Sequence, residues 1–412
     1  MSVDFPSRCM HVRHLRIEYR LRDFRRDPEL LMCLGVVVDN CINLRTLVIQ
    51  SRNFIHFAQL SPEFQDGFCS GERDGLKTLN LRMDPYVPDP YASTDILDVH
   101  IQEMDLPGLT ELHYHGDTLF PSLVGQFHQT IQRLYLTSTS LSCSADDTSW
   151  QPCPHVTELV LRQFPWFDLN LPWLVRMFPN VKVLKLYSDG EMDLDRDDNR
   201  SRNLTCEGWQ SLDKLVGDLY YVYGLGLTCE VRELVISSPF SLRDSSEFID
   251  IMSQMRIGSL NMTVSLATID VWDFFVSMER CNFSDISRIE AQWNIYELDE
   301  SELVSVVEIE YDDTVPPVSM ESVSDEMMTF VKSIERRFSQ ATGNTWEWTL
   351  MEGKNSEDDI SLRLIGERTV RTKNGGPVEV VLPTTGELPG DRKEEVYWSY
   401  RDGVLISESL NE

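Results

Sequence analysis

The chain has 412 residues, 42% of them apolar, and a formal net charge of −30 at pH 7. This charge disfavours DNA, RNA and anionic membranes as partners. No segment approaches the roughly 18–20 uninterrupted apolar residues of a membrane-spanning helix, and the first residues lack the apolar core of a signal peptide. Nine cysteines occur without a CxxC pair. Because their number is odd and no signal peptide is evident, we expect reduced thiols and a cytoplasmic or nuclear protein.

A six-residue phrase recurs along most of the chain, with apolar residues at positions one, four and six, as in VTELVL. Its ten copies occupy residues 12–17, 44–49, 76–81, 109–114, 131–136, 156–161, 181–186, 231–236, 257–262 and 286–291. Copies start 22 to 33 residues apart, except across one interval of 50 that holds either a degenerate copy or an insertion. Leucine-rich repeats share this core and a period of about 20–29 residues. The alternative is an ordinary α/β domain with Leu-rich parallel strands.

The segments between the phrases predict helices. Apolar residues recur at helical spacing in residues 28–41, 171–179, 246–255 and 271–281, and residues 209–227 also have a helical pattern. The acids in residues 193–198 predict a solvated insertion loop. Helices that alternate with short strands form a parallel sheet with the helices on its outer side. The sequence therefore predicts an α/β leucine-rich-repeat solenoid, a horseshoe with the parallel sheet inside and helices outside.

The chain changes character near residue 295. Residues 297–326 contain eleven acids and no Lys or Arg, which indicates a mobile linker or an acidic loop. An amphipathic helix is expected at residues 325–341, followed by strands at 346–350, 360–364, 378–382 and 396–400. We predict a solenoid over residues 1–295, an acidic linker or loop over 296–325, and a small α+β cap over 326–412. The tail from residue 385 is expected to be partly disordered.

Alternation along each strand places the residues between the core positions on the concave side. The predicted inner row is Arg16, Val48, Asn80, His113, Tyr135, Val160, Lys185, Val235, Asn261 and Glu290. A second row is Glu18, Gln50, Arg82, His115, Thr137, Arg162, Tyr187, Ser237, Thr263 and Gln292.

The first seven copies make these two rows basic and aromatic. The predicted partner-binding residues are Arg16, Arg82, His113, His115, Tyr135, Arg162, Lys185 and Tyr187. Arg and Tyr are favoured anchors of protein interfaces, so the hypothesis is a protein partner on the concave face. The competing interpretation is that these are solvated strand residues paired with Glu111, Glu158 and Glu233.

The irregular repeats, with phrases such as FPNVKVLKLY and CPHVTELVL, resemble those of the fungal F-box-like leucine-rich-repeat proteins over residues 12–292. In that family an N-terminal F-box docks on a Skp1-type adaptor, and the repeats recruit a substrate for ubiquitination. The F-box pattern begins LPxE, whereas this sequence has only DPELL at residues 27–31, between two phrases. The resemblance implies substrate recruitment, with adaptor binding only if an F-box is present elsewhere. A stand-alone repeat scaffold is the rival hypothesis.

The sequence does not fit common enzyme motifs. The sequence has no GxSxG, HExxH or GxxxxGK[ST] pattern. His113 and His115 alternate on one strand, but a third zinc ligand is not evident. Asp193, Asp195 and Asp197 resemble a calcium loop, which fails because Asp198 stands where the loop needs Gly. We therefore predict no catalytic residue, metal or cofactor, and an enzyme with an unrecognised site remains the minor alternative.

Overall fold

The computed structural model describes two compact units. One comprises residues 1–212 with 224–227, and the other residues 213–223 with 228–412. Within them the structure describes residues 8–19, 36–37, 40–51, 75–83, 106–115, 118–119, 127–137, 140–141, 151–162, 170–187, 196–267, 271–278, 280–281, 283, 285–296, 345–354, 360–369, 396–401 and 404–409. Within this described part, no helix is long and apolar enough to cross a membrane.

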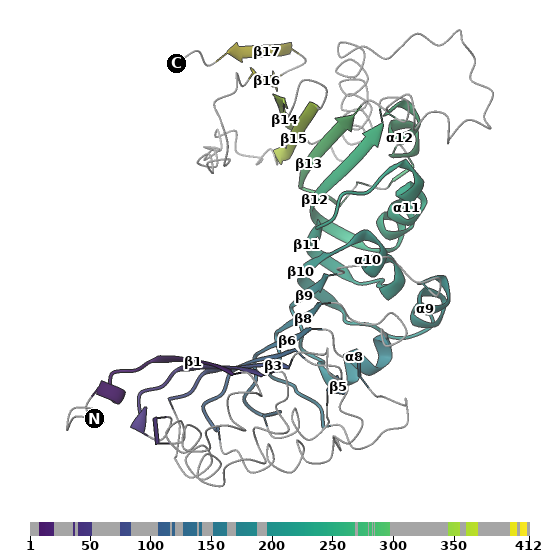
Figure 1. Cartoon of the computed structure of the whole chain (residues 1–412). Coiled ribbons are helices and arrows are strands. Elements are labelled where there is room, and N and C mark those ends of the chain that lie inside the picture. Colours follow the sequence, from purple (N-terminus) through teal and green to yellow (C-terminus); the bar gives the residue numbers. More distant parts are fainter. Residues whose placement is uncertain are drawn as a thin grey trace, which may run out of the picture. The chain divides into compact units, whose positions relative to one another are not determined.

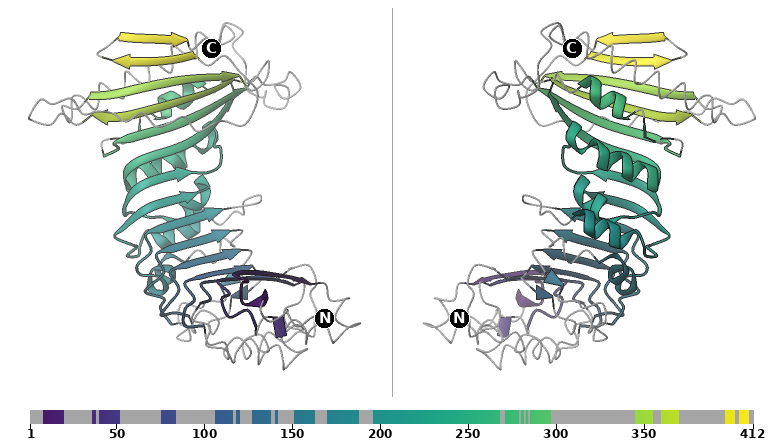
Figure 2. Two further views of the ribbon diagram at one scale, coloured as in Figure 1. Left: turned by 90° about the vertical axis from the view of Figure 1, so that its left-hand side faces the viewer. Right: turned by 90° about the vertical axis from the view of Figure 1, so that its right-hand side faces the viewer.

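The main sheet of the first unit is parallel (Figures 1 and 2). Its strands, in sheet order, are β1 (His14–Tyr19), β2 (Thr46–Ser51), β3 (Thr78–Met83), β4 (Glu111–His115), β6 (Arg133–Thr137), β8 (Glu158–Arg162) and β9 (Val183–Tyr187). Each strand begins at position three of one phrase. The short strands β5 (Thr118–Leu119) and β7 (Ser140–Leu141) pair separately. The first seven phrases therefore form the strands that their pattern predicts.

The apolar positions of the phrase form the core. In nine of the ten copies positions one, four and six are all buried, and Leu109, Leu112 and Tyr114 are at most 1% exposed. Each such leucine contributes roughly 1.5–3 kcal/mol by leaving water. In the first copy Val12 and Leu15 are only half-buried, because no described strand lies beyond β1.

Successive copies are joined at the start of their strands by a repeated backbone pattern. The carbonyl oxygen of Arg13 accepts from the amides of Arg45 (2.8 Å) and Thr46 (3.0 Å). The carbonyl of Arg45 accepts in the same way from Lys77 and Thr78. This pattern fixes the register, because each copy presents one acceptor to two successive donors of the next.

Two helices of the first unit are described, α8 (Leu171–Met177) and α9 (Arg196–Asn203). The amide of Trp173 donates to the side chain of Asn170 at 3.0 Å and so caps α8. The predicted helix over 171–179 is thereby confirmed. The loop predicted over residues 193–198 is wrong from residue 196 onward, because Asp197 and Asp198 occupy the first turn of α9. Acids there are favoured by the helix dipole.

Asn203 at the end of α9 holds the neighbouring segments together. Its Oδ1 accepts from the amide of Leu171 (3.1 Å), and its Nδ2 donates to the carbonyl of Gly224 (3.2 Å). Gly226 follows with φ +61°, and an added Cβ would lie 3.2 Å from the carbonyl oxygen of Arg200. This position therefore requires glycine.

The second unit begins within β10 (Ser211–Gly217), which corrects the helix predicted over residues 209–227. A strand occupies the first half and α10 (Leu219–Leu225) the second. Trp209 and Leu212 stand at positions one and four of a degenerate phrase that has Lys214 at position six. Their spacing of three residues suits a helix as well as the phrase, so periodicity alone did not separate the two. The 50-residue interval thus contains a degenerate copy.

The rest of this unit alternates strands and helices. Strand β11 (Glu230–Ile236) leads through the short 3₁₀ helix Leu242–Asp244 to α11 (Ser245–Gln254). Strand β12 (Arg256–Ala267), helix α12 (Val271–Met278) and strand β13 (Arg288–Tyr296) follow. Strands β11, β12 and β13 pair in parallel, and the helices lie on one side of them (Figures 1 and 2). The helices predicted at 246–255 and 271–281 are confirmed.

The C-terminal strands are antiparallel. They are β14 (Thr345–Lys354), β15 (Ile360–Thr369), β16 (Val396–Arg401) and β17 (Val404–Ser409). Strand β15 pairs with both β13 and β14, and β16 pairs with β14 and β17. Strands β16 and β17 lie in the tail for which partial disorder was expected. The predicted acidic linker, the helix at 325–341 and the strand at 378–382 lie outside the described residues.

Candidate functional site

Each unit leaves one sheet face uncovered by its described helices, and we call this the open face. In the first unit the predicted inner row is a continuous ladder on it. Successive Cα partners across the strands are Arg16, Val48, Asn80, His113, Tyr135, Val160 and Lys185. The second row is equally continuous, from Glu18 and Gln50 through Arg82, His115, Thr137 and Arg162 to Tyr187. In the second unit Val235, Asn261 and Glu290 are also in register.

The centre of the inner row is an aromatic pair held by one carboxylate. The rings of His113 and Tyr135 stack with centroids 4.0 Å apart and an interplanar angle of 4°. Nε2 of His113 lies 2.6 Å from Oε1 of Glu111, and Arg133 forms an ion pair with the other oxygen of that carboxylate. Burial first, then the negative charges of Glu158 and Glu111, raise the pKa of the Tyr135 hydroxyl. The hydroxyl therefore stays protonated and able to donate at neutral pH.

The positive charge of Lys185 is compensated by Glu158 on the neighbouring strand. Its Nζ donates to Oε1 of Glu158 at 2.7 Å, and this hydrogen bond is the main cause that raises the pKa of Lys185. The side chain is fully charged at neutral pH, but its charge is already compensated. Val160, between Tyr135 and Lys185 in the ladder, is 8% exposed. Val160 was predicted to lie in the inner row, and its side chain offers little exposed surface there.

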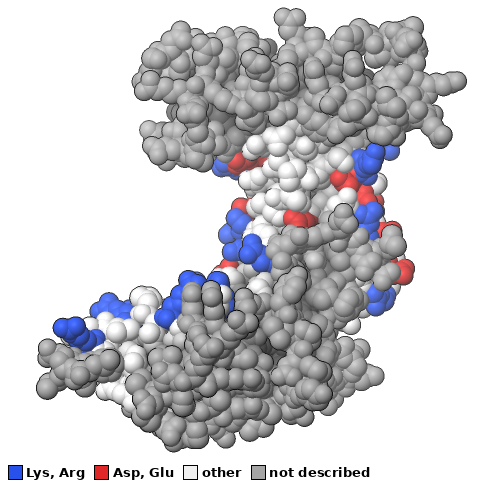
Figure 3. Space-filling view, in the orientation of Figure 1, with Lys and Arg blue, Asp and Glu red and all other residues white. Residues whose placement is uncertain are grey.

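The second row retains cations that no carboxylate of the described residues compensates. The guanidinium of Arg162 lies over the ring of Tyr187, 5.7 Å from its centroid, a cation–π arrangement. Within the described ranges, neither Arg82 nor Arg162 forms an ion pair with an acid. Both side chains are exposed. At the β1 end of this sheet, Nη2 of Arg16 donates to Oε1 of Gln50 at 3.2 Å. Figure 3 shows Lys and Arg gathered over the first unit's strands.

The structure therefore divides the predicted binding residues. His113 and Tyr135 form a stacked pair, Arg162 and Tyr187 form a cation–π pair, and Arg82 and His115 lie beside one another in register. His113 and Lys185 follow the competing interpretation, because each contacts a glutamate.

Sequence reasoning left out a third row of the open face. This row precedes the other two along the strands and consists of His14, Thr46, Thr78, Glu111, Arg133, Glu158 and Val183. The period-two alternation of the phrase, extended to position three, was the signal that could have found it. Two of its members, Glu111 and Glu158, hold the cations and His113 described above.

The described groups give little support for catalytic chemistry. Burial raises the pKa of the Cys153 and Cys281 thiols to about 12 and that of Cys229 to about 11, so all three are protonated and weakly nucleophilic at neutral pH. Among the residues that the structure describes, no three His, Cys, Asp or Glu side chains are grouped to hold a metal. The described residues of the first unit's open face include polar, aromatic and basic side chains.

Comparison with known proteins adds no relative. No protein-family model matches the sequence, and no curated protein matches it.

Proposed function

We propose that this chain is a non-catalytic protein-binding module of the leucine-rich-repeat type. It captures an acidic segment of a partner on the open face of the first unit. The observation that carries the proposal is the second row, in which exposed Arg82 and Arg162 have no acidic partner among the described residues although the chain carries a net charge of −30. Leaving such cations uncompensated on an acidic molecule favours an acidic ligand.

The aromatic side chains supply the second component of the surface. Tyr187 beneath Arg162, and His113 stacked on Tyr135, present rigid rings with polar edges. Such rings bury area on binding while losing little conformational entropy. A partner segment that carries acids together with apolar or aromatic side chains would match both components.

The proposal is tested by reversing the two uncompensated charges. We expect Arg82→Glu with Arg162→Glu to lower partner capture about tenfold or more, because at least two attractive contacts become repulsive. Lys185 is kept, since its reversal would place a second carboxylate against Glu158. The readout is quantitative affinity purification with the full chain, scored on proteins that the wild-type chain enriches.

The matched control is Arg243→Glu with Arg280→Glu, which makes the same change of net charge on exposed residues of the second unit that pair with no described acid. Thermal unfolding of both variants should stay close to that of the wild type. Equal loss of capture in the control would show a general charge effect, and unchanged capture in the Arg82/Arg162 variant would overturn the proposal.

Recruitment of a substrate for ubiquitination is the finer form of this proposal, and the resemblance of the repeat phrases supports it. The 412 residues carry no LPxE pattern followed by apolar helices. We therefore expect that a Skp1-type adaptor does not co-purify with this chain alone. Stoichiometric capture of the adaptor would favour the F-box form, and its absence would favour a stand-alone scaffold.

We further propose that the antiparallel C-terminal strands act as a cap. Residues Arg288 to Ile295 of β13 are paired with β15, so one hydrogen-bonding edge of β13 is occupied. An unpaired edge would be a template for aggregation, and solenoids require capping elements.

A further inference from the structure

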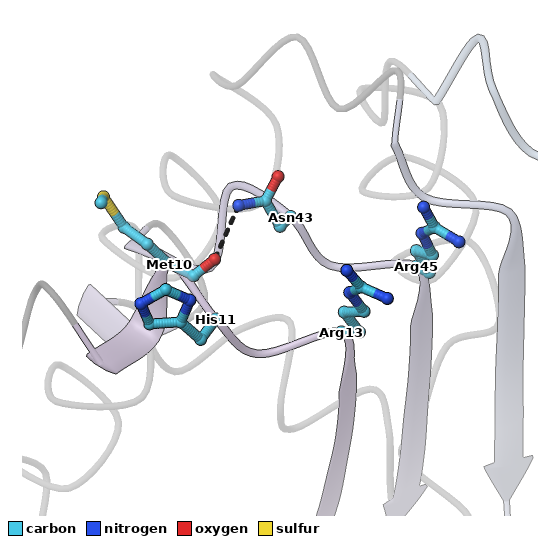
Figure 4. Close-up of a pocket in the computed structure, with 5 residues that line it drawn as sticks. All are labelled: Met10, His11, Arg13, Asn43 and Arg45. Carbon is cyan, nitrogen blue, oxygen red and sulfur yellow. Dashed lines mark hydrogen bonds between the residues drawn. The ribbon is translucent and has the colours of Figure 1, made fainter.

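A pocket lies immediately before the first two strands, outside the rows of the open face (Figure 4). Met10, His11, Arg13, Asn43 and Arg45 line a volume of about 210 Å³. Nδ2 of Asn43 donates to the carbonyl oxygen of Met10 at 2.6 Å and joins the two turns that frame the pocket. The backbone bonds from Arg45 and Thr46 to Arg13 hold its other side.

Two guanidinium groups are placed side by side in this pocket. Arg13 and Arg45 both stand at position two of their phrases, and the amide of Arg45 bonds the carbonyl of Arg13. Neighbouring strands are about 4.8 Å apart, so the fold brings two like charges together. In Figure 4 both side chains extend in the same direction. Among the residues that the structure describes, no acid forms an ion pair with either of them.

We propose that this pocket binds a phosphate monoester carried by a partner protein, a phosphoserine or phosphothreonine side chain. A guanidinium presents a planar fork that matches phosphate oxygens, and its hydrogen bonds to them are charge-assisted. A dianionic phosphate can pair with both arginines, whereas one carboxylate neutralises a single positive charge. Binding also removes the repulsion between Arg13 and Arg45. His11 adds a further nitrogen at the pocket wall.

The surroundings favour a peptide over a free ion. Met10 lines the pocket and is 45% exposed, and Ile42, the chain neighbour of Asn43, is 67% exposed. The exposed side chain of Met10 gives the rim of this cationic pocket an apolar surface that a flanking residue of a bound peptide can cover. The pocket does not depend on the proposed open-face site, because its residues precede the strands and share none of the second-row cations.

The proposal is tested with the full chain and fluorescein-labelled peptides that have degenerate flanking positions and a central phosphoserine, serine or glutamate. We expect the phosphoserine pool to bind at least about tenfold more tightly than the serine and glutamate pools, by fluorescence anisotropy. Inorganic phosphate should compete only weakly, because it makes no rim contact. Affinity should fall as salt is raised.

Arg13→Gln with Arg45→Gln should abolish the preference for phosphoserine. The matched control is Lys182→Gln with Arg232→Gln, which removes two cations from the same phrase position in other copies and should leave the preference within about twofold. Circular dichroism checks that each variant is folded. The wild-type comparison of the three pools does not depend on any variant.

Three results would overturn the proposal. Equal binding of phosphoserine and glutamate pools would show a general anion preference. Competition by inorganic phosphate at the affinity of the peptide would assign the pocket to a small ion. Retained phosphoserine preference in the folded Arg13/Arg45 variant would place the phosphate elsewhere.

Discussion

The two units use the same phrase and treat their strand cations differently. In the second unit all four Lys and Arg residues of the strands β10 to β13 are paired with acids: Lys214 with Glu233 at 2.6 Å, Arg232 with Asp213 at 4.0 Å, Arg256 with Glu230 at 3.1 Å and Arg288 with Glu290 at 3.4 Å. In the first unit Arg133 and Lys185 are paired, while no described acid pairs with Arg82 or Arg162. Among the described residues, the strand cations are therefore compensated in the second unit and only partly compensated in the first.

The contrast separates the core positions of the phrase from the positions between them. Positions one, four and six repeat because each fills the same place in the core. The residues between them need only suit a strand, so they can carry paired charges in one unit and uncompensated charges in the other. The two units therefore share a core and differ in their open faces.

The largest expected effect tests the shared core. Leu184→Ala in the first unit and Leu260→Ala in the second should each lower the free energy of unfolding by about 2–5 kcal/mol, because both leucines are fully buried and leave a cavity. Urea unfolding monitored by circular dichroism measures the change. The controls are the half-buried neighbours Val183→Ala and Asn261→Ala, and losses as large in them would break the assignment of core positions.

A smaller effect, common to both units, concerns buried thiols. In the folded chain the pKa of Cys153 rises from 9.0 to about 12 through burial. The protonated thiol with its raised pKa contributes stability to the folded state below pH 9. This contribution is lost as the pH rises from 9 toward 12. The difference in unfolding free energy between the wild type and Cys153→Ala should therefore shrink by about 1 kcal/mol between pH 8 and pH 10.

Urea titrations at the two pH values, under reducing conditions, measure this change. Cys281→Ala in the second unit should behave in the same way, because burial raises the pKa of Cys281 to about 12 as well. Leu184→Ala provides the control, since it leaves a cavity without removing a titrating group. A thiol contribution that does not vary with pH would contradict the assigned burial.

The smallest expected effect is a difference in coupling free energy between two ion pairs. The side chains of Lys185 and Glu158 are 29% and 19% exposed, against 71% and 60% for Arg256 and Glu230. Double-mutant cycles with Met for the cation and Gln for the acid should give a coupling of about 1 kcal/mol for the first pair. We expect about 0.3 kcal/mol or less for the second, where water and salt screen the charges. Equal couplings would mean that the first unit's centre is as solvated as the second unit's face.

Much of the architecture could be predicted because it depends on local pattern. The ten phrases predicted ten strands, and the expected inner row from Arg16 to Lys185 is a ladder of Cα partners. Helices α8, α11 and α12 followed from apolar spacing. The segment from Trp209 could not be assigned correctly, because a spacing of three residues suits a helix and a strand of this repeat equally.

The candidate site could be predicted only in outline. The alternation rule placed Arg82, Arg162 and Tyr187 on one row. The competing interpretation named Glu158 as a pairing acid without assigning it to Lys185, and no rule set Arg162 over Tyr187. The pocket of Arg13 and Arg45 was absent from the sequence-based expectations. Its residues lie 32 positions apart and meet only because position two of successive copies is joined by backbone hydrogen bonds.

The sequence by itself determined the core, because a period-two pattern of apolar residues within a longer repeat leaves few ways to remove them from water. The tertiary structure alone decided which charges are compensated. That outcome depends on side chains from different copies that approach within a few ångströms, and the strength of an ion pair changes steeply with distance and burial. The function proposed here rests on those distances.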